Sequence, residues 1–341
     1  MEWERGAAQL KVADIAKLAH TSPSTVSKVI NGRSGMSEAT RRRVEKTLKD
    51  VGYAKKLVST RISRSIELVV RKLSNDGAVA LLQELLPQAQ ANGMGVGVTE
   101  LGSHAEDDNL AQVIEKNPYG VVLLLSDASQ TARHTLRARS IPFVIIDPVG
   151  EIPDEDLSVN IDNWTGGLAA TRHLIALGHR RIAMITGPDF ALSSASRAAG
   201  YEHALRESGI KLDRALIRTG NWQPEQGHDA AYSLLTMPNR PTAIFALSDL
   251  MAVGIYQAAA ELGLNIPDDL SVVGFDNTFP APYLGAGLTS VNQPFDVMAA
   301  KSIDLIRSAR EGEITDRHVV LPVNLVVRDS TGEPLPAGIA S

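Results

Sequence analysis

The chain has 341 residues and a mass of 36.5 kDa, a length typical of two or three domains. With 44% hydrophobic and 21% charged residues, its composition is that of a globular protein and excludes a wholly disordered chain. The absence of cysteine excludes disulfides, thiolate metal sites and cysteine nucleophiles. No apolar run reaches the roughly 20 residues of a membrane helix, and the N-terminus lacks the apolar segment of a secretory signal. We therefore expect a cytoplasmic protein without membrane contact.

Charge is distributed unevenly along the chain. The net charge is −5, but residues 1–64 contain 14 Lys and Arg against 6 Asp and Glu, which gives +8 for this segment and −13 for the rest. A cationic N-terminal segment on an anionic body indicates that only this segment meets a polyanion such as DNA. A basic, solvated surface without a partner is the alternative.

The basic segment has the residue spacing of three short helices. Apolar residues recur at helical spacing over 12–19 and again over 26–30. Ser22 stands at an N-cap position and Pro23 at the first helical position, so the second helix should begin there. Ser37 would cap a third helix. Two short helices joined by a tight turn and supported by a third form the helix-turn-helix plan, whose second helix enters the DNA major groove.

This plan predicts which side chains contact DNA. Residues at the start of the second helix face the bases, while basic and hydroxyl side chains also bind phosphates. Lys28 could donate to a guanine edge or to a phosphate, whereas Arg41 fits phosphate contact or an ordinary solvated face. The predicted DNA contacts from the three helices are Ser22, Pro23, Ser24, Thr25, Ser27, Lys28, Asn31 and Arg41.

A family resemblance becomes specific in these residues. The stretches VADIAKLAHTSPSTVSKVINGR and MSEATRRRVEKTLKDVGY resemble the DNA-binding domain of LacI/GalR-type bacterial transcription regulators. The shared elements are D-I-A, T-V-S-K-V-I-N, and S-x-x-T-R-x-x-V followed by G-Y. His20 replaces the glycine that the family usually has in the turn, so we expect a positive φ there at a cost of about 1 kcal/mol.

The linker after Tyr53 is a few residues shorter than in the family. The resemblance implies a short hinge helix on DNA, from which an apolar residue wedges into the minor groove. Counting back from Ile66 places Val58 at the wedge position, whereas counting forward from Tyr53 places Ile62 there. Both assignments stay open.

From Ile66 onward, apolar runs of strand length alternate with amphipathic helical stretches, which predicts doubly wound parallel sheets. The pattern restarts near Asp162 after a proline-rich, acidic junction, and this favours two α/β lobes over one (β/α)₈ barrel. The expected strands are 66–70, 95–99, 120–125, 142–147, 181–187, 242–247 and 270–275. The expected helices are 79–91, 165–177, 196–208, 224–235 and 250–262.

The same part of the chain, up to about Thr331, resembles the family's effector-binding core, which is similar to periplasmic sugar-binding proteins. Strong stretches include DNWTGGLAATRHLIALGHRRIAMITG and PTAIFALSDLMAVGIYQAAAELGLNIPDDLSVVGFDN. The resemblance implies that the chain crosses between lobes near Asn160, Val291 and Pro322. The implied organisation is a DNA-binding head at 1–54, a linker at 55–65, an N-lobe at 66–161 and 292–320, a C-lobe at 162–291 and 321–331, and a tail at 332–341.

Polar residues at the ends of the predicted strands are candidates for a binding site, because ligands of open α/β sheets bind outside the carboxyl ends of strands. The strand ends give Asp147, Ser248, Asp249, Asp276 and Asn277. The resemblance adds Arg197 and Trp222, and weaker candidates are Asn75, after the first strand, and Gln293, at a crossing. Carboxylates and an arginine hold vicinal hydroxyls, and a tryptophan face covers a sugar ring, so we expect a small sugar-like effector.

Each of these residues also has a purely structural interpretation. Asp147 precedes a proline and could form a turn, and Asp276 could cap a loop. Trp222 could belong to the core. Asp249 could N-cap the helix that starts at Leu250.

Motifs of common enzyme classes are missing. The sequence has no P-loop, HExxH or GxSxG, and its alternating glycines at 93, 95 and 97 do not form a dinucleotide-binding loop. The eight histidines lack the spacing of metal ligands. We therefore expect no catalytic residues, no metal and no cofactor.

These observations predict a sequence-specific DNA-binding regulator, expected to be a repressor, whose operator affinity depends on an effector bound between the lobes. One small head makes few contacts, so we expect a homodimer on near-palindromic double-stranded operator DNA. The alternatives are a sugar-binding receptor protein without DNA-binding activity, and an enzyme acting in the cleft. Phosphosugars and purines remain open as effectors, as does the sign of the effector's influence on DNA binding.

Overall fold

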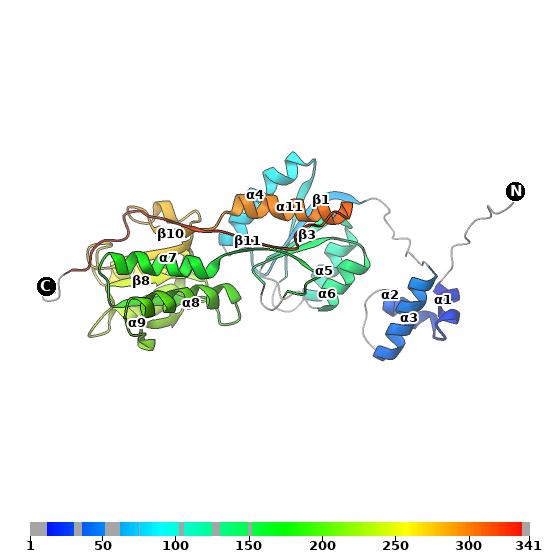
Figure 1. Ribbon diagram of the computed structural model, residues 1–341, viewed down its shortest axis with the longest axis horizontal. Coiled ribbons are helices and arrows are strands. Elements are labelled where there is room, and N and C mark those ends of the chain that lie inside the picture. The colour runs from blue at the N-terminus through cyan, green and yellow to red at the C-terminus, as the bar shows by residue number, and fades with distance from the viewer. Residues whose placement is uncertain are drawn as a thin grey trace.

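The computed structural model describes residues 12–30, 36–51, 62–74, 76–101, 106–124, 130–148 and 152–335. Figure 1 shows a three-helix head at one end of the molecule, followed by two α/β lobes arranged along its long axis. The N-lobe lies on the side of the head, and the last described residues before position 336 lie on the far side of the C-lobe. This arrangement confirms the expected helix-turn-helix head and two-lobed parallel core.

The head contains α1 (Val12–Leu18), α2 (Pro23–Ile30) and α3 (Glu38–Asp50). Its small core consists of Ile15, Ala16, Ala19, Val26 and Val44, all buried. The Ser22 hydroxyl accepts a hydrogen bond from the Thr25 backbone N–H at 3.1 Å, so α2 begins at the predicted cap. His20 has φ +46°. A positive value was expected because His20 stands at the turn position where the family usually has glycine.

The N-lobe is a six-stranded sheet in the order β11-β5-β4-β3-β1-β2, and every neighbouring pair is parallel. Its strands are β1 (Ser63–Val70), β2 (Gly95–Glu100), β3 (Pro118–Leu124), β4 (Phe143–Ile146), β5 (Leu157–Ile161) and β11 (His318–Leu321). Its helices are α4 (Asp76–Ala91), α5 (Glu106–Glu115), α6 (Gln130–Ala138) and α11 (Phe295–Glu311). Central strands are buried on both faces, which explains their continuous apolar runs.

The C-lobe has a second six-stranded sheet, in the order β12-β10-β9-β8-β6-β7, with only the edge strand β12 antiparallel to its neighbour. Its strands are β6 (Ile182–Thr186), β7 (Ile217–Thr219), β8 (Ala243–Ala246), β9 (Ser271–Asp276), β10 (Thr289–Asn292) and β12 (Asn324–Val326). Its helices are α7 (Asn163–Ala176), α8 (Leu192–Glu207), α9 (Pro224–Leu235) and α10 (Asp249–Glu261). Two separate sheets exclude the barrel alternative.

The chain passes between the lobes three times: at Asp162, at residues 293–294 and at residues 322–323. The Asp162 N–H donates to the Leu321 carbonyl at 2.9 Å, so two of these crossings run side by side. Strand β1 begins at Ser63, inside the range 55–65 that the sequence suggested for the linker. Strand β5 lies within the segment that we interpreted as a junction. No helix in the described part of the chain is long and apolar enough to cross a membrane.

Candidate functional site

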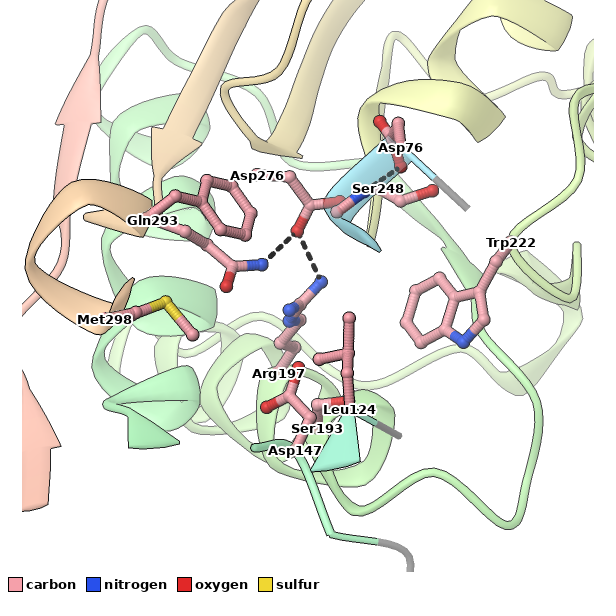
Figure 2. A pocket seen from close by; sticks show the side chains of 12 residues that line it. Asp76, Leu124, Asp147, Ser193, Arg197, Trp222, Ser248, Asp276, Gln293 and Met298 are labelled. Carbon is pink, nitrogen blue, oxygen red and sulfur yellow. Dashed lines mark hydrogen bonds and ion pairs between the residues drawn. The ribbon is translucent and has the colours of Figure 1, made fainter. Parts of the chain in front are cut away.

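A cavity lies where the carboxyl ends of the strands of the two lobes face each other (Figure 2). The space between its walls, open mouth included, is about 470 Å³. The N-lobe, the C-lobe and the crossing at 293–294 with α11 all contribute side chains. These are Asp76, Leu124, Asp147, Ser193, Arg197, Trp222, Ser248, Asp276, Gln293, Phe295 and Met298, beside Gly77.

Arg197, on α8, lies at the centre of the cavity and is only 3% exposed. Its Nε donates to Asn163 Oδ1 at 2.8 Å, and one terminal nitrogen donates to the Leu247 carbonyl at 2.6 Å and to Asp276 Oδ1 at 3.2 Å. Its guanidinium carbon is 3.6 Å from the ring centroid of Phe275. The guanidinium is therefore held from several sides before any ligand binds.

Asp276 ends β9 and receives two donors on one carboxylate oxygen. Besides Arg197, the Gln293 amide donates to Asp276 Oδ1 at 2.5 Å, as the dashed lines in Figure 2 show. Burial raises the pKa of Asp276 well above its ordinary value, and the opposing charge of Arg197 only partly offsets this effect. Gln293 lies in a segment where the chain crosses between the lobes. This hydrogen bond therefore links the cavity directly to a lobe crossing.

The N-lobe contributes two further carboxylates, Asp147 and Asp76. Asp147 follows β4, and Asp76 is the first residue of α4. Burial raises the pKa of both carboxyl groups. The Thr278 hydroxyl, which belongs to the C-lobe, donates to Asp76 Oδ2 at 2.5 Å. This hydrogen bond joins the lobes across the cleft.

Asp249 is fully buried behind the cavity wall and does not cap α10 as its alternative interpretation suggested. The cap is Ser248, whose hydroxyl accepts from the Met251 N–H at 3.3 Å. Asp249 instead accepts from the Ser290 hydroxyl at 2.6 Å and the Thr278 N–H at 2.8 Å. Burial raises the pKa of Asp249 to about 7. Asp249 therefore supports the loop after β9 from behind.

Trp222 forms one wall of the cavity rather than part of a closed core. Its ring centroid is 5.5 Å from the guanidinium carbon of Arg197. The ring packs over Gly187, where an added Cβ would lie 2.0 Å from the indole. Glycine at 187 therefore permits this position of the ring.

Backbone strain is concentrated around the cavity. Asp147, Trp222 and Asp276 have φ values of +48°, +61° and +106°, in a region that L-residues other than glycine seldom adopt. Such conformations cost on the order of 1–3 kcal/mol each and persist where the surroundings impose them. Because strained conformations cluster at binding and catalytic sites, these three lining residues make the cavity the candidate functional site.

The structure brings together six of the nine candidates that the sequence offered: Asp147, Arg197, Trp222, Ser248, Asp276 and Gln293. Asp249 and Asn277 do not line the cavity. Asn75 lies outside the described residues. The sequence interpretation missed Asp76, Leu124, Ser193, Phe295 and Met298. Asp76 had a usable signal, because an acidic residue opening a helix just after a buried strand lies at the same sheet edge as the other candidates.

The head exposes the expected surface of its second helix. Ser22, Pro23, Ser24, Ser27 and Lys28 are exposed, while Thr25 and Arg41 are partly buried. The Ser22 hydroxyl is 2.8 Å from the hydroxyls of both Ser24 and Thr25. Ile62 is 43% exposed directly before β1, whereas Asn31 and Val58 lie outside the described residues.

A helix-turn-helix head combined with a two-lobed core and a polar cavity between its lobes defines a ligand-responsive DNA-binding protein. Comparison with known proteins agrees. Residues 11–56 match the family model "Bacterial regulatory proteins, lacI family", and residues 171–331 match the model "Periplasmic binding protein-like domain".

The HTH-type transcriptional repressor PurR of Escherichia coli O139:H28 is 32% identical over 303 residues, which span 86% of this chain and 89% of the relative. Two solved structures share the fold. A complex of the transcriptional regulator CelR with cellobiose has a TM-score of 0.72 and 31% identity, and covers 94% of this chain and 99% of its own. The lac repressor dimer bound to operator and the anti-inducer ONPF has a TM-score of 0.70 and 26% identity, and covers 95% and 99%.

The chain belongs to the lacI family of bacterial regulatory proteins. It is a DNA-binding transcription regulator with an effector-binding core, and the relatives compared above are regulators of transcription rather than enzymes.

Proposed function

We propose that this protein is a transcriptional repressor that binds a near-palindromic operator as a homodimer. Its affinity for the operator falls or rises when a sugar-like molecule occupies the cleft. The observation that carries the proposal is the meeting of carboxylates from both lobes around Arg197 and Trp222 in one cavity. A ligand held by both lobes binds the closed form better than the open form. Its binding therefore shifts the balance between lobe arrangements.

The charge of the cavity restricts the effector. Asp76, Asp147 and Asp276 face one arginine, so acceptor oxygens outnumber fixed cations. Carboxylates accept hydrogen bonds from hydroxyls, and the indole of Trp222 offers an apolar face to a sugar ring. A phosphate placed among these carboxylates would be repelled. We propose a neutral polyhydroxyl effector in this cavity.

The proposed DNA contacts come from the exposed start of α2. Ser24, Ser27 and Lys28 would face the major groove, with Ser22, Pro23, Thr25, Asn31 and Arg41 nearby at the bases or phosphates, and Val58 or Ile62 in the minor groove. Residues 1–54 would form the head, and the linker would end at residue 62, because the core strand β1 begins at Ser63. Because its proposed target is operator DNA, we propose that the protein acts in the cytoplasm.

We propose that the cleft binds its ligand without turnover. Ser193 and Ser248 are the hydroxyl side chains that line the cavity, and its described lining contains no histidine or lysine that could act as their base. The described residues also hold no group of three metal-ligating side chains. Incubation with the sugars that bind should therefore return them unchanged, as chromatography of the mixture would show.

A thermal-shift screen of the full chain against a carbohydrate panel, followed by gel shifts on the operator with each hit, tests the proposal. We expect at least one neutral sugar to raise the melting temperature and to change operator retention. Sugar binding without any DNA retention would favour the receptor alternative. A melting temperature raised only by purines or phosphosugars would refute the sugar assignment.

A further inference from the structure

A second chamber opens beside the inner cavity. It encloses about 930 Å³, open mouth included, against about 470 Å³ for the inner cavity. Leu124 and Trp222 line both spaces, so the two are adjacent and meet at these side chains. Figure 2 shows Trp222 at the side of the inner cavity, away from Gln293 and Met298. A ligand that fills the inner cavity can therefore extend past the indole into the outer chamber.

Both lobes form the walls of the outer chamber. The loop after β1 supplies Arg71 from the N-lobe, and the loop after β6 supplies Phe190 from the C-lobe. The guanidinium carbon of Arg71 lies 5.2 Å from the ring centroid of Phe190, a cation–π contact between the lobes. Phe190 is nevertheless 50% exposed. An aromatic ring left half open beside a binding cavity offers surface for a ligand.

The polar groups of the chamber are the amides of Asn221, Gln223 and Gln226 and the cations of Arg71 and Lys72. Gln223 and Gln226, at the beginning of α9, add side-chain N–H donors and carbonyl acceptors to the N–H donors of Arg71. Amide and guanidinium groups bind hydroxyls, while the faces of Phe190 and Trp222 accommodate the C–H face of a pyranose. This combination of aromatic surface, amides and the two cations Arg71 and Lys72 differs from the carboxylate-rich inner cavity.

We propose that the outer chamber is a second sugar subsite, so that the effector is a disaccharide or longer glycoside with its first ring among the carboxylates and its second ring against Phe190. The inference rests on the proposed sugar-binding function and specifies its ligand. A compact anion could use Arg71 and Lys72 but would leave the apolar walls without a partner. A second ring uses both, and it also touches both lobes.

Isothermal titration calorimetry of the full chain with glucose, galactose, cellobiose, maltose, lactose and glucose 6-phosphate tests the inference. We expect one disaccharide to bind at least about tenfold more tightly than either monosaccharide. Phe190→Ala should remove that advantage and leave monosaccharide affinity unchanged, while Phe190→Tyr keeps the ring and the advantage. Tyr232→Ala removes a comparably exposed aromatic ring on α9 outside both spaces and should change neither affinity.

The outcomes separate this inference from the proposed function. Equal affinity for monosaccharides and disaccharides, or a Phe190→Ala variant that keeps the advantage, overturns the second subsite while sugar control of DNA binding stands. Preference for glucose 6-phosphate over glucose that is lost in Arg71→Ala overturns it in favour of an anion site. Absence of binding by all six compounds overturns it as well, and the operator gel shifts then decide separately whether the proposed function survives.

Discussion

Arg197 illustrates how one buried side chain organises the cavity, because its donors reach α7, the end of β8 and Asp276 at once. Arg197→Lys retains the positive charge beside Asp276 but cannot make these bonds together. We expect a loss of at least about tenfold in effector affinity, with operator binding retained. Calorimetry and gel shifts measure the two.

Arg172→Lys is the matched control for this change. Arg172 forms an exposed ion pair with Glu207 on the outer face of the C-lobe, and such pairs contribute little to stability. Both affinities should therefore be unchanged in Arg172→Lys. Normal effector affinity in Arg197→Lys would remove Arg197 from the proposed site.

Asp249 gives the fold a specific pH dependence. Its pKa is raised to about 7 in the folded protein, so the folded state binds a proton more tightly than the unfolded state does. The stabilisation is complete below the unfolded pKa of about 4 and is lost as the pH rises through 7, at roughly 1 kcal/mol per pH unit. The free energy of unfolding by urea should fall between pH 5 and 7 in the wild type, and more gently in Asp249→Asn.

Asp213→Asn is the control for this titration. Its hydrogen bonds lower the pKa of Asp213, so this carboxyl stays ionised from pH 5 to 7 and the slope should match that of the wild type. Identical slopes for the wild type and Asp249→Asn would show that Asp249 does not titrate in this range.

At the scale of the element, α2 begins at the Ser22 cap and exposes the side chains that we propose contact the bases. Lys28→Ala removes one donor from that face without touching the head core. We expect operator binding to weaken by about 1–3 kcal/mol and effector affinity to stay constant. Lys301→Ala, an exposed lysine on α11, is the control. Unchanged operator retention in a gel shift of Lys28→Ala would argue against the proposed orientation of α2.

The close packing of α7 on α8 fixes the helix that carries Arg197. A Cβ at Gly167 would lie 2.1 Å from the Arg197 carbonyl oxygen, so Gly167→Ala must push α8 away. We expect a loss of about 1–3 kcal/mol in unfolding free energy, together with weaker effector binding. At Gly95 an added Cβ would meet only the Arg64 carbonyl oxygen, 4.0 Å away, so Gly95→Ala should keep full effector affinity. If Gly167→Ala bound the effector normally, the position of α8 would not control the site.

Sequence patterns predicted the elements whose burial is continuous. The strands near 66–70, 120–125 and 270–275 carry apolar runs because both of their faces are covered. Strands β7 and β12 have three residues each and partly exposed side chains, so they lack any such run. The order of strands across a sheet likewise leaves no periodic signal.

The residues of the candidate site likewise divide into those that a local sequence pattern predicts and those that it does not. Asp147 and Asp276 could be predicted because Asp147 directly follows β4 and Asp276 is the last residue of β9, and both strands are recognisable in the sequence. The role of Asp76 depends on Thr278, 202 positions away along the chain, and no local pattern encodes a contact over that separation. Asp249 was misinterpreted for a related reason, since its partners Ser290 and Thr278 belong to a distant part of the C-lobe.

At the scale of the whole molecule, the separation of charge predicts different salt responses for the two activities. The segment 1–64 carries +8 and the remainder −13. Operator affinity should fall steeply with salt, because each neutralised phosphate contributes a slope of about −0.9 to the log–log plot. Effector affinity should change little, since the cavity is buried and its proposed ligand is neutral. A flat plot for the operator would contradict the proposed phosphate contacts.

The three crossings have a mechanical consequence. They lie along one border of the core, where Asp162 is bonded to Leu321 and the Asn292 amide donates to Asn324. Three crossings aligned in this way leave the two lobes one easy motion, a rotation about the line on which the crossings lie. Gln293 lies on that line and holds Asp276. A ligand that binds Asp276 therefore acts close to this axis of rotation. A ligand that contacts Phe190 and Arg71, beyond Trp222, acts farther from the axis.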